Sequence, residues 1–318
     1  MKNTRVKKIL LLLCVGAMLC AACKRASSIY DKQGLEKINR HDYYGAIEEY
    51  DKAVEYNPDD DTAYYYRALA KDCMKFYQGA LADYNKELAL NPGDARAYYN
   101  RGLVRCEMDD YEGAVIDFTK AAQLVPEFGD AYHNRGGAKY NLHDYKGAMA
   151  DYNKALELDP GDANAYNSKG LLHHALGDYE AAFVDYSVAV KLKPDFEQAY
   201  CNRGYAAYKM KWYPKAYDDF DTALALDPDD AIAYYDRALI KKDLLFYKAA
   251  LADYDKAIEY DSDFSEAYCD RGFAKYHLKD YQGAIADYSK AIELDPDDSD
   301  AYDNREDIKE LMGKKKRR

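Results

Sequence analysis

Small and apolar residues recur along this chain with a period of 34 residues. Proline follows the same period, and Ser262 stands at the one place where it is missing; the prolines of the series are Pro58, Pro92, Pro126, Pro160, Pro194, Pro228 and Pro296. With each proline near the end of its unit, the sequence divides into eight units, residues 27–60, 61–94, 95–128, 129–162, 163–196, 197–230, 231–264 and 265–298. A fixed period of this length is typical of an array of repeated supersecondary units.

Each unit carries the pattern of two helices. Its apolar residues have helical spacing, which is interrupted near the fifteenth place by a turn signal such as His-Asp or Gly-Asp. In every unit the fourth and seventeenth places are tyrosine, the eighth is glycine or alanine, and the twentieth is alanine. Small residues let two helices approach closely while the aromatic rings fill the space alongside. The sequence therefore predicts eight helical hairpins.

Two charged places vary together. The seventh place is a cation and the twenty-third an aspartate in units two to eight, whereas unit one has Gln33 and Glu49. The cations are Arg67, Arg101, Arg135, Lys169, Arg203, Arg237 and Arg271, and the aspartates are Asp83, Asp117, Asp151, Asp185, Asp219, Asp253 and Asp287. This covariation predicts partly buried, charge-assisted ion pairs between the helices of one unit or of neighbouring units. A structural role is favoured over a ligand site because the pair recurs in seven units.

The repeated pattern resembles that of the tetratricopeptide repeat family, in which an aromatic, a small residue, an aromatic, alanine, an aromatic and proline recur over 34 residues. The resemblance extends from Ser27 to about Met312. It implies an all-α fold, a right-handed superhelical solenoid of eight helix-turn-helix repeats over residues 27–298. Residues 299–313 resemble the capping helix that ends such arrays, and residues 314–318 form a basic tail.

The resemblance also implies a concave groove, lined by the first helix of each repeat. We call the residues that it assigns to peptide binding the groove residues: Tyr65, Tyr66, Tyr99, Asn100, Asn134, Tyr140, Asn202, Tyr205, Tyr208, Tyr235, Asp236, Asp270 and Tyr276. Tyrosine offers a large amphipathic contact area, and an asparagine amide can both donate to and accept from a peptide backbone. The alternative is that tyrosine is simply the habitual aromatic of this chain. Acidic residues on the same face favour a neutral or basic guest.

The first residues have the pattern of an export signal. Residues 1–22 combine a basic start, an apolar run from Ile9 to Leu19 and the small residues Ala21 and Ala22. They resemble a bacterial lipoprotein signal, which implies that Cys23 is lipidated and that residues 23–28 are the anchor cysteine and a short linker. Ordinary cleavage near Ala22, giving a free secreted or periplasmic protein, is the alternative.

Composition and motifs argue against several other functions. The chain has a net charge of −12, and its middle is more acidic still because both ends are basic, so nucleic acid is not expected as a partner. It contains no phosphate loop, dinucleotide-binding glycine motif, zinc-protease motif, nucleophile elbow or EF-hand loop. His174 approaching Cys201 or His133 makes a metal site conceivable, but packed or solvent-facing histidine is the usual case. We therefore expect no enzyme activity, cofactor or metal.

The sequence thus predicts a non-catalytic protein–protein interaction scaffold of the bacterial cell envelope that binds an extended or helical segment in its groove. It is expected to be exported and held as a lipoprotein on the periplasmic face or the cell surface. A glycan- or peptidoglycan-binding envelope protein is the alternative, because tyrosine rings can also stack on sugars.

Overall fold

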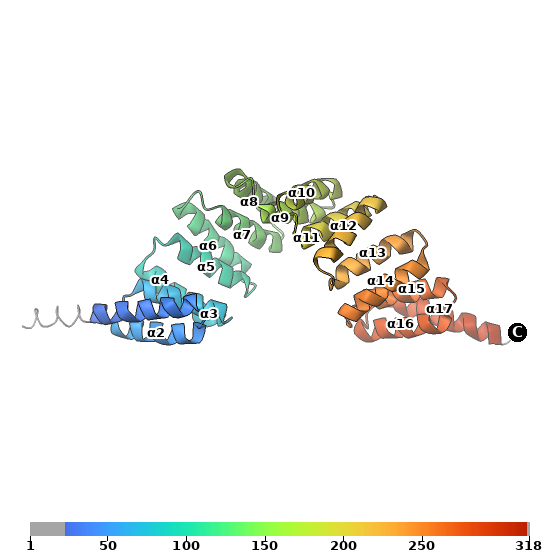
Figure 1. Cartoon of the computed structure of the whole chain (residues 1–318), viewed down its shortest axis with the longest axis horizontal. Helices are drawn as coiled ribbons and strands as arrows, with labels where there is room; N and C mark the ends of the chain where they lie inside the picture. The colour runs from blue at the N-terminus through green and yellow to red at the C-terminus, as the bar shows by residue number, and fades with distance from the viewer. Residues whose placement is uncertain (1–22, 317–318) are drawn as a thin grey trace, which may run out of the picture. The chain divides into compact units, whose positions relative to one another are not determined.

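A computed structural model describes residues 23–316 of the 318-residue chain. The export signal expected at residues 1–22 lies outside this range. The described residues form helices joined by short turns, without strands, and divide into two compact units on either side of the Pro160–Gly161 bond (Figure 1). No helix among them is both long and apolar enough to span a lipid bilayer.

The first unit holds four helical hairpins. Its helices are residues 23–39, α2 (Tyr43–Tyr56), α3 (Asp61–Cys73), α4 (Tyr77–Leu90), α5 (Ala95–Cys106), α6 (Tyr111–Leu124), α7 (Gly129–Asn141) and α8 (Tyr145–Leu158). Each hairpin packs against the next one in the chain, and the first helices α3, α5 and α7 also contact one another in sequence.

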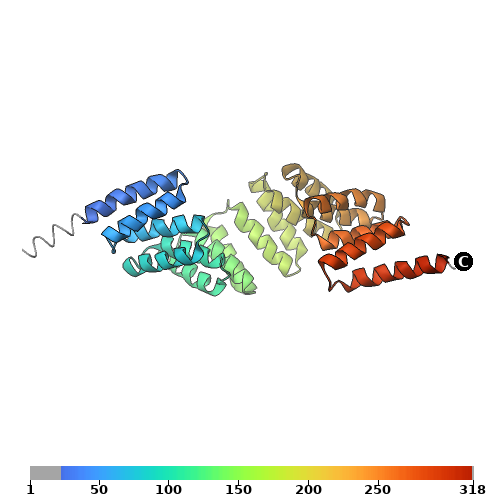
Figure 2. The same ribbon diagram turned by 90° about the horizontal axis from the view of Figure 1, so that it is seen from below.

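The second unit holds four more hairpins and a final helix. Its helices are α9 (Ala163–Ala175), α10 (Tyr179–Leu192), α11 (Glu197–Lys209), α12 (Tyr213–Leu226), α13 (Ala231–Asp243), α14 (Tyr247–Tyr260), α15 (Ser265–His277), α16 (Tyr281–Leu294) and α17 (Ser299–Lys316). The red helix at the chain end in Figure 2 is α17, which packs against α16 and buries Ile308 there. The predicted eight hairpins and capping helix are confirmed; α17 extends beyond residue 313 into the predicted tail.

The short linker expected at residues 24–28 is instead helical. Ser27 is fully buried, and its hydroxyl contacts the Ala53 carbonyl oxygen at 3.1 Å and Asp60 Oδ2 at 2.5 Å. The Tyr30 ring stacks on the Tyr56 ring with centroids 5.5 Å apart. The first repeat therefore begins directly after Cys23, without an extended leash.

Aspartate side chains start most of the helices. Asp42 accepts a hydrogen bond from the Gly45 amide at the start of α2, and Asp230 accepts from two amides at the start of α13. Such caps satisfy amides that have no partner within the helix. Six helices begin instead with an aromatic residue that forms no side-chain cap bond, namely Phe76, Phe128, Phe196, Trp212, Phe246 and Phe264.

A close contact between the two helices of a hairpin joins the eighth and twenty-fourth places. At Gly102 an added Cβ would lie 2.7 Å from the Phe118 ring, and at Gly170 it would lie 2.6 Å from the Tyr186 ring. Both rings are fully buried. The second helix thus lays an aromatic ring on the backbone of the first, which explains the small residue that the sequence places there.

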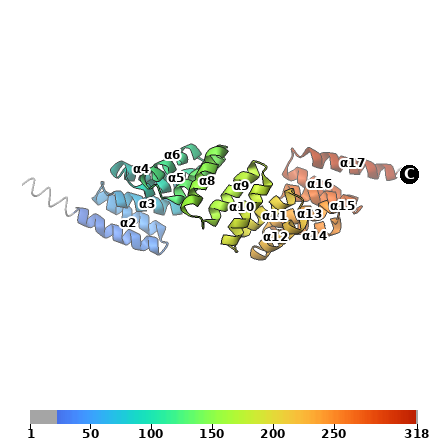
Figure 3. The same cartoon turned by 90° about the horizontal axis from the view of Figure 1, so that it is seen from above.

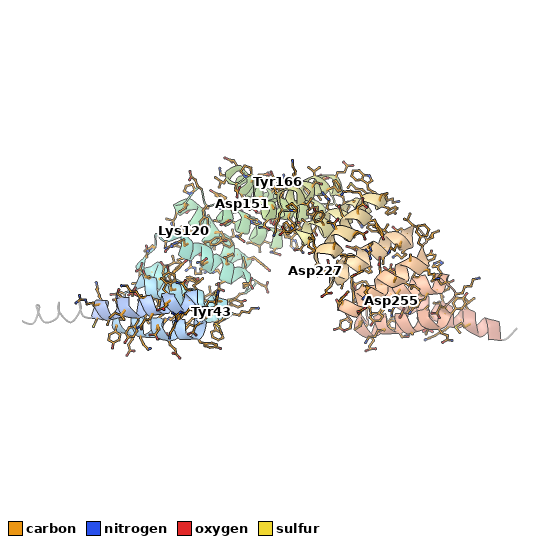
Figure 4. All side chains as sticks on the ribbon, viewed as in Figure 1. Tyr43, Lys120, Asp151, Tyr166, Asp227 and Asp255 are labelled. Carbon is orange, nitrogen blue, oxygen red and sulfur yellow. The ribbon has the colours of Figure 1, made fainter. Side chains whose placement is uncertain are left out.

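The predicted ion pairs form within each repeat. In repeat four, Arg135 binds Asp151 with two parallel bonds, Nε to Oδ2 at 2.8 Å and Nη2 to Oδ1 at 2.6 Å. Asp151, labelled on α8 in Figure 4, is 4% exposed. The same pair joins the two helices in repeats two to eight, with Lys169 as the single-nitrogen variant at 3.2 Å from Asp185. Parallel bonds of this kind are strong and directional.

Each of these arginines also reaches the preceding repeat. Arg135 Nη1 contacts Thr119 Oγ1 at 3.1 Å on α6, and Arg67 Nη1 binds Asp51 Oδ1 at 2.7 Å on α2. Equivalent bonds join Arg101 to Asn85, Arg203 to Ser187, Arg237 to Asp221 and Arg271 to Asp255. One guanidinium therefore joins three helices of two repeats.

A second basic side chain, which the sequence pattern did not predict, approaches each aspartate. Lys139, at the eleventh place, lies 2.7 Å from Asp151. The same place supplies Lys71, Arg105, His173, Lys241 and Lys275 in other repeats. Repeat six has Ala207 there, and Lys215 of α12 contacts Asp219 at 2.8 Å instead. In repeat one Lys37 binds Glu49 at 2.9 Å.

Replacing Asp151 with alanine should strongly destabilise the first unit, because it leaves Arg135 and Lys139 without their counter-charge. Breaking a buried pair in this way costs roughly 3–5 kcal/mol. We expect the lower end of that range, because Arg135 and Lys139 keep 15% and 20% of their side chains exposed. The free energy of unfolding from urea titrations measures the loss.

The matched control is Glu157→Gln, on the same helix. Glu157 pairs with Lys154 at 2.9 Å but is 69% exposed, so its loss should cost less than about 0.5 kcal/mol. Equal stability of Asp151→Ala and the wild type would contradict a structural role for the buried pair.

Candidate functional site

The groove residues of the first unit are linked from one repeat to the next. Asn100 Nδ2 donates to Tyr65 Oη at 2.9 Å, and Asn134 Nδ2 donates to Tyr99 Oη at 3.0 Å. Each bond crosses from one first helix to the first helix of the preceding repeat. The asparagines predicted to hold a peptide backbone therefore each use an amide N–H to align neighbouring helices.

The second unit uses different atoms for the same link. Asn202 Nδ2 donates to Asn167 Oδ1 at 3.0 Å, and Tyr235 Oη donates to Asp270 Oδ2 at 3.0 Å. Lys242 pairs with the other oxygen of Asp270 at 2.7 Å. Asp270 was predicted to add negative charge to the groove, but this lysine compensates its charge.

The groove tyrosines keep part of their surface open. Tyr276 is 37% exposed, and the other seven are half-buried: Tyr65, Tyr66, Tyr99, Tyr140, Tyr205, Tyr208 and Tyr235. Burial raises the pKa of Tyr99 to about 12, so its hydroxyl stays a hydrogen-bond donor at neutral pH. By contrast, the rings at the twenty-fourth place, such as Tyr186, are fully buried. The two tyrosine sets thus divide into a core set and a surface set.

Asp236 does not lie on the surface as predicted. It is 7% exposed and is recessed in a pocket of about 550 Å³ in the second unit. Burial and the nearby Asp230 raise the pKa of Asp236 to about 7. No hydrogen bond or ion pair from the described residues reaches its carboxylate. It is therefore a buried acid without a compensating partner.

The pocket lies along α9, α11 and α13, which follow one another in Figure 3. Its aromatic side includes Tyr235 and Phe264, whose ring centroids are 4.8 Å apart, and Tyr205, whose ring lies 5.3 Å from His174. Of the groove residues, Asn202, Tyr205, Tyr235 and Asp236 line this pocket together. Tyr276 lines a separate pocket of about 320 Å³ beside α17.

Three further pocket residues were not among the groove residues, and of these only Cys201 was considered from the sequence, as a metal ligand beside His174. Glu197 and Cys201 lie one turn apart on α11, and Asp230 caps α13. Cys201 Sγ lies 3.0 Å from Glu197 Oε1 and 3.3 Å from Asp230 Oδ2. Burial and these two carboxylates raise the pKa of the Cys201 thiol, and burial raises the pKa of Glu197. The sequence indicates only a helix cap at Asp230, so the position of this residue in the pocket was not predicted.

Two minor expectations are refined. His174 and Cys201 do line one pocket, whereas His133 belongs to the other unit and packs against Tyr152 with ring centroids 5.8 Å apart. Burial and Lys209 lower the pKa of His174, which keeps its imidazole neutral.

Models of the tetratricopeptide repeat match the sequence in both units. The matches described as tetratricopeptide repeat cover residues 197–230 and 265–298 for one model and 32–70 and 75–128 for another, and those described as TPR repeat cover 138–177 and 170–211. Together they span well over half of the chain. The comparison with curated proteins returned no match.

Several solved structures share the fold. The APC/C hetero-tetramer Cut9–Hcn1 aligns with a TM-score of 0.64 and 16% identity over 84% of this chain and 52% of that chain, so this chain spans about half the length of that relative. PilF of Pseudomonas aeruginosa has a TM-score of 0.58 and 20% identity over 67% of this chain and 96% of its own. MamA from Desulfovibrio magneticus RS-1 has a TM-score of 0.52 and 19% identity, over 54% and 97%. At such identities the likeness shows the fold alone.

The buried carboxylate of Asp236 predicts a pH dependence of stability. Its pKa is about 7 in the folded chain and about 3.9 when unfolded, so the folded state binds the extra proton between these values. Its contribution to stability is fully present below about pH 4 and is lost as the pH rises through about 7. Asp236→Asn, which cannot ionise, should therefore gain stability over the wild type from pH 4.5 to pH 8, by a few kcal/mol at most since one pKa unit is about 1.4 kcal/mol.

Urea unfolding at several pH values measures this gain. Asp270→Asn is the control, because Lys242 and Tyr235 already partner that carboxylate. If the difference between Asp236→Asn and the wild type stayed constant with pH, the carboxylate would not be titrating in this window.

Proposed function

Because the chain belongs to the tetratricopeptide repeat family, whose repeats act in protein–protein interaction, we propose that it is a non-catalytic scaffold holding an extended or helical partner segment along its first helices. One observation carries this proposal. The groove tyrosines of the first helices keep exposed surface, whereas the rings at the twenty-fourth place are buried. Rigid, half-exposed tyrosines provide contact area with little rotamer entropy to lose.

The charges of the second unit indicate which kind of segment fits there. Glu197, Asp230 and Asp236 line its pocket beside aromatic rings, and no ion pair from the described residues compensates them. A neutral or basic segment complements such a surface, and an acidic one is repelled. The same charge argues against nucleic acid as a partner.

A photoreactive analogue at Tyr99 or Tyr205 tests the proposal. Crosslinking in cells should capture a partner protein from each position, because Tyr99 lies on the first helix α5 of the first unit and Tyr205 on the first helix α11 of the second. Ile116 and Val184 are the matched controls, since they are 66% and 60% exposed but lie on the second helices α6 and α10. Mass spectrometry identifies the captured protein.

Equal capture from the control positions would place the contact elsewhere, and no captured protein from either tyrosine would contradict the scaffold. A glycan-binding role is the second candidate, favoured by the aromatic side of the pocket at Tyr205, Tyr235 and Phe264. It predicts retention on immobilised muropeptides and loss of that retention on Tyr205→Ala.

We further propose that the chain is exported and anchored in the cell envelope through a lipid on Cys23. The sequence pattern of residues 1–22 supports this, as do the exposed Lys24 and Arg25, which would meet anionic headgroups. Since residues 24–28 are helical, an anchored chain would begin its first hairpin at the bilayer surface. A free secreted or periplasmic protein, cleaved near Ala22, is the alternative.

Palmitate labelling distinguishes the two. The wild type should incorporate radiolabelled palmitate and fractionate with membranes, and Cys23→Ala should do neither. Cys73→Ala, which changes another cysteine outside the core, is the control and should label normally. Labelling that persists in Cys23→Ala would rule out this anchor.

A further inference from the structure

The pocket of the second unit brings three metal-ligating atoms together. Glu197 and Cys201 face one another because side chains four residues apart share one face of a helix. Asp230 approaches from the start of the next first helix, α13. One ligand atom from each of the three residues lies within 4.8 Å of the other two. Ligands of one zinc ion stand roughly 3.5 Å apart, given bonds of about 2.0–2.3 Å. The sulfur–oxygen distances of 3.0 and 3.3 Å already approach that spacing.

Without a cation the two carboxylates face one another, and the side-chain hydrogen bond between Glu197 and Asp230 forms only if one of them keeps a proton. A thiol carries one proton, so Cys201 can donate to Glu197 or to Asp230 but not to both at once. No ion pair from the described residues reaches either carboxylate. This contrasts with Asp151 at the twenty-third place, which has two cationic partners. The cluster therefore has converging acceptors and no positive charge.

Asp236 gives an independent indication of a cation. Its side chain lines the same pocket, is more than nine-tenths buried, and has no hydrogen bond or ion pair among the described residues. A buried carboxylate is costly unless it is paired or coordinates a metal. It therefore adds a third uncompensated acid to a pocket that already holds two.

Asp230 is oriented as metal ligands usually are. Its Oδ1 accepts from the backbone amides of Ile232 at 2.8 Å and Ala233 at 3.1 Å, which fixes the carboxylate and leaves Oδ2 towards Cys201. Outer hydrogen bonds of this kind orient ligands and tune a metal site.

We propose that Glu197, Cys201 and Asp230 bind a divalent cation of the zinc class. The sulfur selects a borderline or soft ion over calcium or magnesium, which prefer oxygen ligands. The fourth position is left to water on the pocket side, where His174 and Asp236 also line the pocket but lie outside the group of three ligand atoms. Binding replaces the thiol proton by the metal, so one proton is released for each thiolate–metal bond that forms.

The chain contains its own control. Cys269 occupies the same place in repeat eight as Cys201 does in repeat six, and Asp298 corresponds to Asp230. Ser265, however, stands where Glu197 would be, so repeat eight has the cysteine and the cap without the glutamate. The proposed site should therefore form at Cys201 and not at Cys269.

Cadmium and zinc titrations of the full chain, first freed of metal with a chelator, test the site. Cadmium should give a thiolate-to-metal charge-transfer band that saturates at one ion per chain, and calorimetry should show one zinc ion bound with release of a proton. Cys201→Ser should abolish the band, Glu197→Gln should weaken binding about tenfold or more, and Cys269→Ser should change neither. Circular dichroism checks that each variant remains folded.

A gain-of-function variant makes the test independent of folding losses. Ser265→Glu completes the triad in repeat eight and should raise the cadmium stoichiometry to two. Absence of the band in the wild type, equal loss in Cys269→Ser, or displacement of zinc by millimolar calcium would overturn the proposal. The last result would indicate an oxygen-only acidic surface.

Discussion

The arginine at the seventh place is the interaction on which the repeats depend. Arg67 binds Asp83 of its own repeat with two bonds and Asp51 of the preceding repeat with a third. Because the aspartate is buried and its neighbours are charged, a repeat that slipped along its neighbour would leave uncompensated charge in the core. The ion pair therefore fixes register, while the aromatic ring packed on the eighth-place backbone provides the close contact.

This arrangement leaves one face of the first helix free for function. The fourth, seventh, eighth and eleventh places are committed to packing or to ion pairs, and the fifth and sixth places link successive first helices through bonds such as Asn100 to Tyr65. The remaining surface belongs to side chains that differ between repeats, including Tyr205 and Tyr208. In the proposed function the fifth and sixth places would therefore both link successive repeats and face the guest, whereas the remaining places can vary without loss of these links.

The hairpins, the capping helix and the buried ion pairs could all be predicted because the repeats of this one chain can be aligned with one another. The basic residue at the eleventh place was not predicted because its type varies among lysine, arginine and histidine, and repeat six has Ala207 there. Burial of Asp236 was missed because an unpaired acid at a groove place is expected on the surface. Glu197 and Cys201 stand at the first and fifth places of repeat six, and Asp230 caps the first helix of repeat seven. The three residues come together only when these two repeats pack against each other.

The reach of the arginine has a consequence for how such a chain can change in length. Its two partners lie sixteen residues before it and sixteen after it, as Asp51 and Asp83 do around Arg67. Inserting or deleting a whole repeat of 34 residues recreates both partners of the arginine at the new junction. An insertion or deletion of any other length within the helices removes at least one of these partners. Gene duplication in whole repeats is therefore the route by which each unit could have lengthened without passing through an unstable intermediate.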